Sequence, residues 1–287
     1  MYKIGFMPSG TMIPWEPEKM CAFVREAGYD AIELQSMLVN AFEDAEGRRG
    51  RFVAAAESNE LLISELVSQR DFVVLDETER KTNIEAVLTD LRIAADMGIG
   101  VVNLFTGPQP WLENPVVIGK NITTQKAWEL VFDAFDTILP AAEALKIRIA
   151  VENVWGMLCH DFFTHKYLNS RYGSAYLGVN LDPSHDVLYG NTDMHFLVNG
   201  WGDKIFHVHL KDAVGVPEAN RFAFPLLGEG IVNWTAFFSA LKGIGYDGCM
   251  SVEFESWGYI KTALSGRHED TAKVSRELID KLLASVM

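Results

Sequence analysis

The sequence predicts an α/β protein folded as a single (β/α)8 TIM barrel, with residues 1–287 forming one domain. Short apolar runs of β-strand character alternate with helical segments, and no linker-like, low-complexity or charge-block segment interrupts them. The length of 287 residues is near the usual size of this fold, about 250 residues. A doubly wound open sheet is the alternative, but that fold normally carries a glycine-rich phosphate loop after its first strand, and none follows here.

The predicted elements follow one another in a regular order. Glycines typical of helix ends, Gly28, Gly98 and Gly245, stand just before predicted strands. The clearest helical periodicity covers residues 18–28, 79–98 and 127–146. The predicted strands are residues 2–7, 31–34, 62–67, 100–105, 147–154, 177–182, 205–212 and 249–255.

Composition restricts the class of partner. Apolar residues make up 48% of the chain, which is ample for a core, and the net charge of −14 argues against a nucleic acid as the main partner. The start, MYKIGFMPSG, lacks the features of a signal peptide, and no run of apolar residues is long enough to cross a membrane. The three cysteines are far apart and are expected to be reduced. We therefore expect a cytoplasmic protein that binds neither nucleic acid nor a membrane.

The strand at residues 205–212, IFHVHLKD, has two different faces. Phe206, Val208 and Leu210 alternate with His207, His209 and Lys211, so one face is apolar and the other ionisable. In a barrel the apolar face packs against the surrounding helices, and the polar face points to the barrel axis. The same alternation recurs on other strands. We expect the following residues to converge at the C-terminal mouth: Glu33, Glu65, Asn103, Glu152, Asp182, His209 and Glu253.

Converging carboxylates require a cation, because they repel one another and lose hydration when buried. No matching cluster of arginines lies on the inward faces, which favours a divalent metal ion. The expected ligands are Glu152, Asp182, His209 and Glu253, one from the end of each of the last four strands. Three carboxylates and one imidazole form a hard, oxygen-rich set that suits Mn²⁺ best, then Mg²⁺, with Co²⁺ or Zn²⁺ as further options.

Other residues near the predicted mouth are candidates for substrate binding. His185 lies three residues after Asp182 and can face the same mouth. Trp155 follows the metal-binding glutamate by three positions, and Trp111 and Trp15 lie in loops after predicted strands. Tryptophan rings are suitable walls for the apolar face of a sugar.

Several polar residues have two interpretations. Lys211 is a candidate for substrate binding, but a structural role, in which it pairs with Asp212 or caps the barrel, is slightly favoured. Glu33 can contact the substrate or anchor a loop, and the loop role is favoured. His207, one pleat deeper than His209, is expected to be a hydrogen-bonded core histidine. The remaining histidines fall on predicted helices or loops, where we expect exposure to solvent; they are His160, His165, His195 and His268.

Six motifs together resemble the sugar-phosphate isomerase/epimerase-like barrels related to xylose isomerase. They are GYDAIEL, VENVW, LDPSH, HVHLKD, LGEGIVNW and SVEFE, in this order along the chain. That superfamily includes ketose 3-epimerases, inosose dehydratases, hydroxypyruvate isomerases and apurinic endonucleases. The resemblance implies the same four metal ligands as the strand faces do, and it implies that His185 touches substrate or metal. It also suggests a homodimer or homotetramer.

The motifs disfavour one class of the superfamily, the apurinic endonucleases, as the function of this protein. The apurinic endonucleases carry additional zinc-binding histidines on strands three and four and an Asp-x-His before the Gly-x-Gly segment. Here strand four offers Asn103, strand three has no histidine, and Phe222-Ala223-Phe224 precedes GEG. The three-metal cluster therefore cannot form.

The chemistry expected of such a site is proton abstraction next to a carbonyl group. A metal ion with open positions polarises the carbonyl of a hydroxy-ketone and stabilises the enediolate that forms. Glu152 and Glu253 are the expected catalytic bases, acting from opposite faces of a small ketose or a related sugar- or polyol-derived compound. This predicts an isomerase, with 3-epimerase activity favoured. The alternatives are an inosose dehydratase-like lyase and, less favoured, a non-catalytic sugar-binding protein or a hydrolase.

Overall fold

The computed structural model describes residues 2–40, 42–217 and 221–284. Its barrel strands are β1 (Lys3–Phe6), β2 (Ala31–Gln35), β3 (Leu62–Val67), β4 (Val101–Leu104), β5 (Arg148–Glu152), β6 (Leu177–Leu181), β7 (Ile205–Leu210) and β10 (Cys249–Val252). They pair in the order β1-β10-β7-β6-β5-β4-β3-β2 and close into a ring. The predicted (β/α)8 barrel is thereby confirmed, and the open sheet is excluded.

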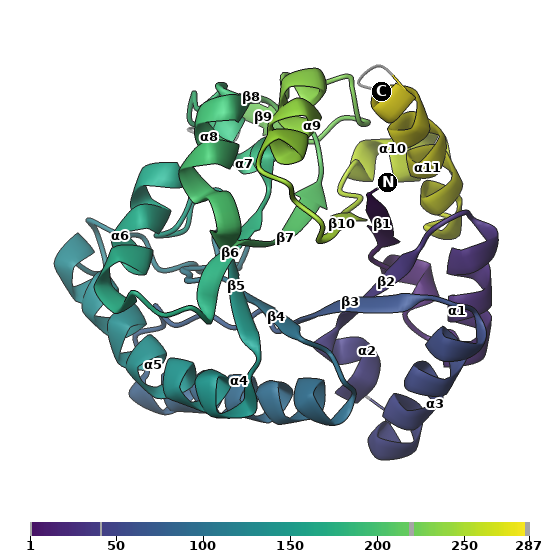
Figure 1. The fold of residues 1–287 in the computed structure, drawn as a ribbon. Coiled ribbons are helices and arrows are strands. Elements are labelled where there is room, and N and C mark those ends of the chain that lie inside the picture. The colour runs from purple at the N-terminus through teal and green to yellow at the C-terminus, as the bar shows by residue number, and fades with distance from the viewer. Residues whose placement is uncertain (1, 41, 218–220, 285–287) are drawn as a thin grey trace.

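Helices surround this ring (Figure 1). They are α1 (Pro17–Glu26), α2 (Ser36–Asn40), α3 (Ala45–Ser58), α4 (Glu77–Asp96), α5 (Thr124–Leu145), α6 (Phe162–Tyr172), α7 (Pro183–Leu188), α8 (Met194–Trp201), α9 (Trp234–Gly243), α10 (Trp257–Thr262) and α11 (Glu269–Ala284). Within the described ranges, no helix combines the length and apolar character that crossing a membrane requires.

Local sequence signals explain where the long helices begin and end. The Asp76 side chain accepts a hydrogen bond from the Glu79 backbone N–H at the start of α4, and Thr123 caps α5 in the same way. After α4, Gly98 has a φ of +72°, a left-handed conformation that glycine adopts without steric cost. The predicted helices at 18–28, 79–98 and 127–146 therefore correspond to α1, α4 and α5 within a few residues.

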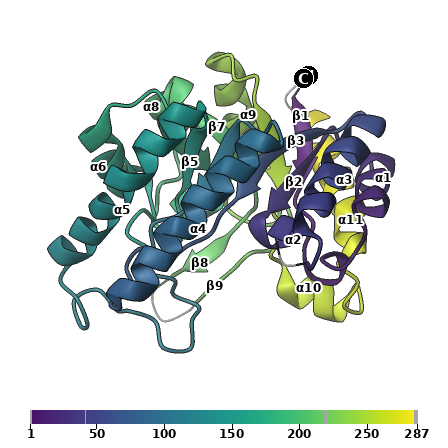
Figure 2. The same cartoon turned by 90° about the horizontal axis from the view of Figure 1, so that it is seen from below.

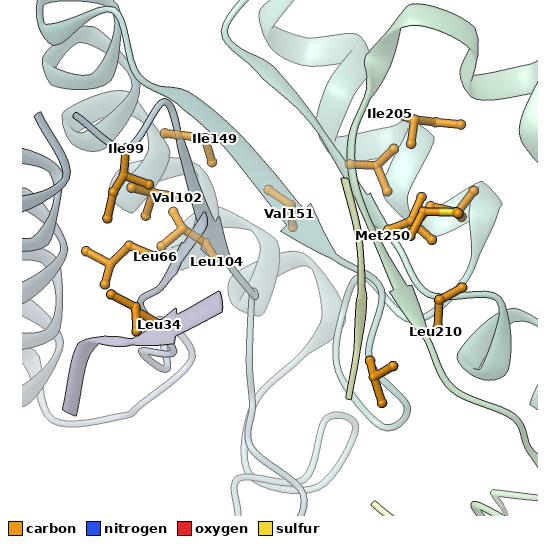
Figure 3. Packing of buried hydrophobic residues seen from close by; sticks show 14 of the residues in the cluster. Leu34, Leu66, Ile99, Val102, Leu104, Ile149, Val151, Ile205, Leu210 and Met250 are labelled. Atoms are coloured by element: carbon orange, nitrogen blue, oxygen red, sulfur yellow. The ribbon is translucent and has the colours of Figure 1, made fainter. Parts of the chain in front are cut away.

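The apolar faces of the strands lie outside the ring, where they pack against the helices. Figure 3 shows Leu66, Val102, Leu104 and Val151 among this packing, and all four side chains are buried. Because side chains alternate across a strand, the polar residues between them must point to the barrel axis. The sequence pattern thus places ionisable groups inside the ring.

A hairpin that the sequence pattern did not predict follows β7. Its strands, β8 (Val214–Val216) and β9 (Arg221–Ala223), pair antiparallel. Figure 2 shows the hairpin at the end of the barrel away from the N-terminus, on the same side as α10. It brings aromatic side chains over the mouth of the barrel.

Candidate active site

The four expected metal ligands converge at the C-terminal end of the ring. Glu152 ends β5, His209 lies in β7, and Asp182 and Glu253 directly follow β6 and β10. The Nδ1 atom of His209 lies 3.1 Å from Glu152 Oε1 and 3.4 Å from Glu253 Oε2. One ligand atom from each of the four residues lies within 4.8 Å of the others, and all four residues are buried.

This cluster fits a divalent metal ion. Carboxylate oxygens and one imidazole nitrogen are hard ligands of the kind that Mg²⁺, Mn²⁺ and Zn²⁺ accept. Asp182 Oδ2 is buried and lies next to the Lys211 ammonium group but accepts no hydrogen bond, whereas Oδ1 accepts one from the Ser184 backbone N–H at 2.8 Å. A buried carboxylate oxygen aimed into a cluster of ligands is the kind of group that a metal ion satisfies.

A lysine ammonium group lies at the edge of this cluster. Lys211 Nζ is 3.0 Å from Asp182 Oδ2, 2.5 Å from Glu253 Oε2 and 3.0 Å from Glu255 Oε2. Burial would lower the pKa of Lys211, but these three carboxylates raise it well above its usual value. The structure therefore directs Lys211 into the site and away from the alternative partner Asp212.

The carboxylates of the cluster differ in how readily they ionise. Burial raises the pKa of Asp182 to about 6, although the Lys211 ammonium group acts in the opposite direction. Burial would also raise the pKa of Glu253, but Lys211 and then His209 lower it well below its usual range. Glu253 is thus held as a carboxylate by two cationic neighbours.

His185 lies beside the cluster and is neutral. Its Nδ1 accepts a hydrogen bond from the Trp155 backbone N–H at 3.3 Å, so the ring proton is on Nε2, which lies 3.4 Å from Asp182 Oδ2. Burial, followed by the Lys211 charge, lowers the pKa of His185 well below its usual value. The Nε2–H group of His185 therefore faces the carboxylate of Asp182 without forming a hydrogen bond to it.

A second buried group of residues contacts the other ring nitrogen of His209. Its Nε2 atom lies 3.0 Å from Glu33 Oε1 and 3.6 Å from Glu65 Oε1. The other oxygen of Glu33 lies 3.0 Å from His207 Nε2, which also lies 3.0 Å from Ser251 Oγ. His207 is therefore the hydrogen-bonded core histidine that we expected. The loop-anchoring role expected of Glu33 is wrong, because its side chain is fully buried on the barrel axis.

The histidines expected on the surface are not all exposed. His165, on α6, is buried and packs against Trp201 at 5.0 Å between ring centroids. Neither of its ring nitrogens has a hydrogen-bond partner, and burial lowers its pKa to about 3. The expectation failed because this position of α6 packs against Trp201 at the end of α8.

The mouth of the barrel opens into a cavity of about 810 Å³ that reaches Glu152, Glu253, Lys211 and His185. Trp111 and Trp155 line it, as expected. Trp15 does not; its ring packs edge-on against Phe23 at 5.4 Å, with Lys19 Nζ 3.6 Å from its centroid. The loop after β1 turns back onto α1, and this carries Trp15 away from the cavity.

Sequence reasoning missed part of the cavity wall. Phe222 and Phe224 line the cavity from the hairpin, Trp257 lies at the start of α10, and Glu255 follows β10. The two phenylalanines in RFAFP could have indicated this part of the wall, because large apolar side chains in a loop often line a binding surface.

Comparison with known proteins agrees with this geometry. A family model described as xylose isomerase-like TIM barrel matches residues 21–282. The chain belongs to the xylose isomerase-like TIM barrel family. The match confirms the resemblance to xylose isomerase-related barrels that the six sequence motifs indicated.

The inosose dehydratase of Geobacillus thermodenitrificans is 26% identical to this xylose isomerase-like barrel over 161 residues, which are 51% of this chain and 53% of that protein. The chain spans between 49% and 59% of the length of the curated relatives it matches.

Two solved structures share the fold. The IolI protein with a bound zinc atom has a TM-score of 0.80 at 19% identity, covering 99% of both chains. An L-ribulose 3-epimerase has a TM-score of 0.75 at 21% identity, covering 100% of this chain and 96% of that one.

Proposed function

We propose that this protein is a metal-dependent sugar isomerase, with 3-epimerase activity on a ketose or a related polyhydroxy carbonyl compound favoured. The observation that carries the proposal is that Glu152 and Glu253 lie 3.1 Å and 3.4 Å from the same atom, His209 Nδ1. They come from β5 and β10, which are separated in the ring by β6 and β7. Two carboxylates that approach one point from separate strands can act on opposite faces of a bound sugar.

The four residues Glu152, Asp182, His209 and Glu253 would hold the metal ion, for which Mn²⁺ is the favoured candidate. When bound, the ion would polarise the substrate carbonyl and stabilise the negative charge that develops on its oxygen. One glutamate accepts the proton from the adjacent carbon, and the electron pair of the broken C–H bond moves toward the carbonyl. The other glutamate returns a proton to the opposite face, which inverts that carbon.

The names of two compared proteins support this chemistry. One is an epimerase of a ketose, and the other is a dehydratase of an inosose. Both reactions begin with loss of a proton next to a carbonyl, so one site can serve either class.

A lyase is the second candidate function, and the position of Lys211 favours it. Its buried ammonium group lies at the cavity wall beside Glu253 and Glu255. An ammonium group there can give a proton to a leaving hydroxyl group on the carbon next to the carbanion. The C–O bond then breaks, water leaves, and a double bond remains.

The test is deuterium exchange. The protein is incubated with Mn²⁺ in D₂O and a panel of ketoses, inososes and hydroxypyruvate, and the products are analysed by mass spectrometry. We expect deuterium at one carbon, with an inverted centre for an epimerase and loss of water for a lyase. The Glu152→Gln variant should lose the exchange. If metal binds but no compound exchanges, proton abstraction is not the reaction of this site.

A further inference from the structure

A second cluster of ligand-type side chains lies inside the ring, beside the candidate metal site but away from the cavity. Its members are Glu33 on β2, Glu65 on β3 and His207 on β7, and we call these three residues the inner cluster. Each is at most 1% exposed, and none of the three lines the cavity. The inner cluster is therefore closed off from the space in which a substrate would bind.

The atoms of the inner cluster have the spacing of a metal site. Their ligand atoms all lie within 4.8 Å of one another. His207 Nε2 lies 3.0 Å from Glu33 Oε2, 3.9 Å from Glu65 Oε1 and 3.0 Å from Ser251 Oγ. Ligands at about 2.0–2.2 Å from a tetrahedral ion are about 3.3–3.6 Å apart. The observed distances lie on both sides of this range, so small side-chain movements would admit an ion among the four residues.

Hydrogen bonds within the protein leave two buried oxygen atoms at the inner cluster without a donor. One is Glu65 Oε2. The other belongs to Asn180, which is paired in register with His207 on the neighbouring strand and whose Nδ2 donates to Glu65 Oε1 at 3.4 Å. Asn180 is fully buried, and its Oδ1 has no partner. Buried acceptors without donors are rare, and they indicate a bound ion or water molecule.

The charge inside the ring favours an ion over water. Five carboxylates are buried together there, those of Glu33, Glu65, Glu152, Asp182 and Glu253. Among the described residues, Lys211 is the sole lysine or arginine that pairs with any of them. With neutral histidines, Lys211 and one divalent ion in the candidate metal site supply three positive charges, so two negative charges remain. Buried charge without a partner is costly, and a second divalent ion would neutralise it.

We propose that Glu33, Glu65 and His207 bind a second divalent ion, the inner ion, with Ser251 Oγ as its fourth ligand. Four ligands that include an imidazole favour Zn²⁺. His209 stays outside this set, because its Nε2 contacts the other oxygen of Glu33, Oε1, at 3.0 Å. The inner ion is structural, since it fixes the carboxylate that orients His209. This inference goes beyond the proposed function, because the inner ion takes no part in proton transfer.

The test separates the two ions by how they exchange. The protein is produced with Zn²⁺ and Mn²⁺ in the medium, and inductively coupled plasma mass spectrometry gives the metal content per chain. We expect two ions per chain at first, one after dialysis against EDTA, and none after dialysis against EDTA in urea. The ion in the candidate metal site can leave through the cavity, whereas the inner ion leaves only when the barrel opens.

The outcomes distinguish this inference from the proposed function. Complete loss of metal from the folded protein in EDTA would overturn the inner ion and leave the metal-dependent reaction standing. A single ion that EDTA does not remove would support the inner ion and count against the metal-dependent reaction.

Two variants assign the retained ion to its ligands. Glu65→Gln keeps the shape of the side chain but removes its charge, so the ion retained in EDTA should fall from one per chain to near zero. Asp182→Asn, in the candidate metal site, is the reciprocal control and should lose the exchangeable ion while keeping the retained one. Circular dichroism shows whether each variant is folded. A folded Glu65→Gln protein that retains the ion would overturn the inference.

A measurement on the unchanged protein does not depend on any variant. Crystals of the EDTA-dialysed protein are examined by anomalous X-ray scattering at the zinc edge. We expect a peak at bonding distance, about 2.0–2.2 Å, from His207 Nε2 and from the Glu33 and Glu65 carboxylates. No peak at this position would overturn the inference and would show that water or a proton satisfies Glu65.

Discussion

The Nε2 atom of His209 lies 3.0 Å from Oε1 of Glu33, on a strand that is not its neighbour in the ring. Because a carboxylate only accepts hydrogen bonds, Nε2 donates its proton to Glu33. Nδ1 lies 3.1 Å from Glu152 Oε1 on the opposite side of the ring, so Nδ1 is the nitrogen that gives up its proton when a metal ion binds in the cluster. Glu33 thus determines which nitrogen of His209 is offered to a metal ion.

Glu33→Gln should weaken metal binding about 10- to 100-fold, because an amide can turn its NH₂ group toward Nε2 and release this constraint. Isothermal titration calorimetry with Mn²⁺ measures the affinity of each variant for the metal ion. Glu129→Gln, at an exposed position on α5, is the control and should bind metal as the unchanged protein does. Equal affinities for Glu33→Gln and the control would show that Glu33 does not orient His209.

Lys211→Met should destabilise the protein in the presence of a chelator. Loss of the ammonium group leaves Asp182 and Glu253 buried side by side without their cationic partner. Removal of one partner from a buried ion pair costs about 3–5 kcal/mol of unfolding free energy. Urea unfolding measures the loss, and added Mn²⁺ should restore part of it. Lys126→Met, at an exposed ion pair with Glu129, is the control and should leave the free energy of unfolding nearly unchanged.

Asp212→Ala should loosen the segment that follows the hairpin. The Asp212 carboxylate accepts hydrogen bonds from the backbone N–H groups of Gly228, Gly230 and Val232 and from the Trp234 indole, at 2.9 to 3.1 Å. Hydrogen bonds to a charged group contribute about 1.5–3 kcal/mol each, so we expect a loss of at least 3 kcal/mol in urea unfolding.

Gly230→Ala should have a related effect, since an added Cβ would lie 2.0 Å from Asp212 Oδ1. Both variants should also become sensitive to proteolysis between residues 225 and 234. Asp247→Ala removes an exposed carboxylate and serves as the control. If Asp212→Ala unfolds at the same urea concentration as Asp247→Ala, the carboxylate does not hold this segment.

His165 should make stability depend on pH. Its pKa falls from 6.5 to about 3 in the folded protein because of burial. Between these values the unfolded chain binds a proton that the folded protein does not, so stability decreases as pH falls below 6.5. From pH 7 to pH 5 the loss should be about 2 kcal/mol. In His165→Phe this contribution should vanish, whereas His195→Phe, at an exposed position, should retain it. The same pH dependence in both variants would contradict the assignment.

The sequence predicted the strands and the inward direction of the proposed metal ligands, because alternation along a strand is a local signal. It did not predict which side chains meet across the ring. Glu33, on β2, contacts His207 and His209 on β7, which is not next to β2 in the ring, and the sequence of one strand does not record such a contact. The burial of His165 and the path of Trp15 likewise depend on how a helix or loop packs against the rest of the chain.

The two halves of the chain contribute differently to the site. All four proposed ligands of the active-site metal ion follow residue 151, on β5, β6, β7 and β10 or just after them. The first half contributes side chains that hold those ligands, chiefly Glu33, together with Asn103, which donates a hydrogen bond to Glu152 at 3.3 Å. A substitution in the first half can therefore disturb the hydrogen bonds that orient a proposed ligand, whereas a substitution at one of these four positions in the second half removes a proposed ligand itself.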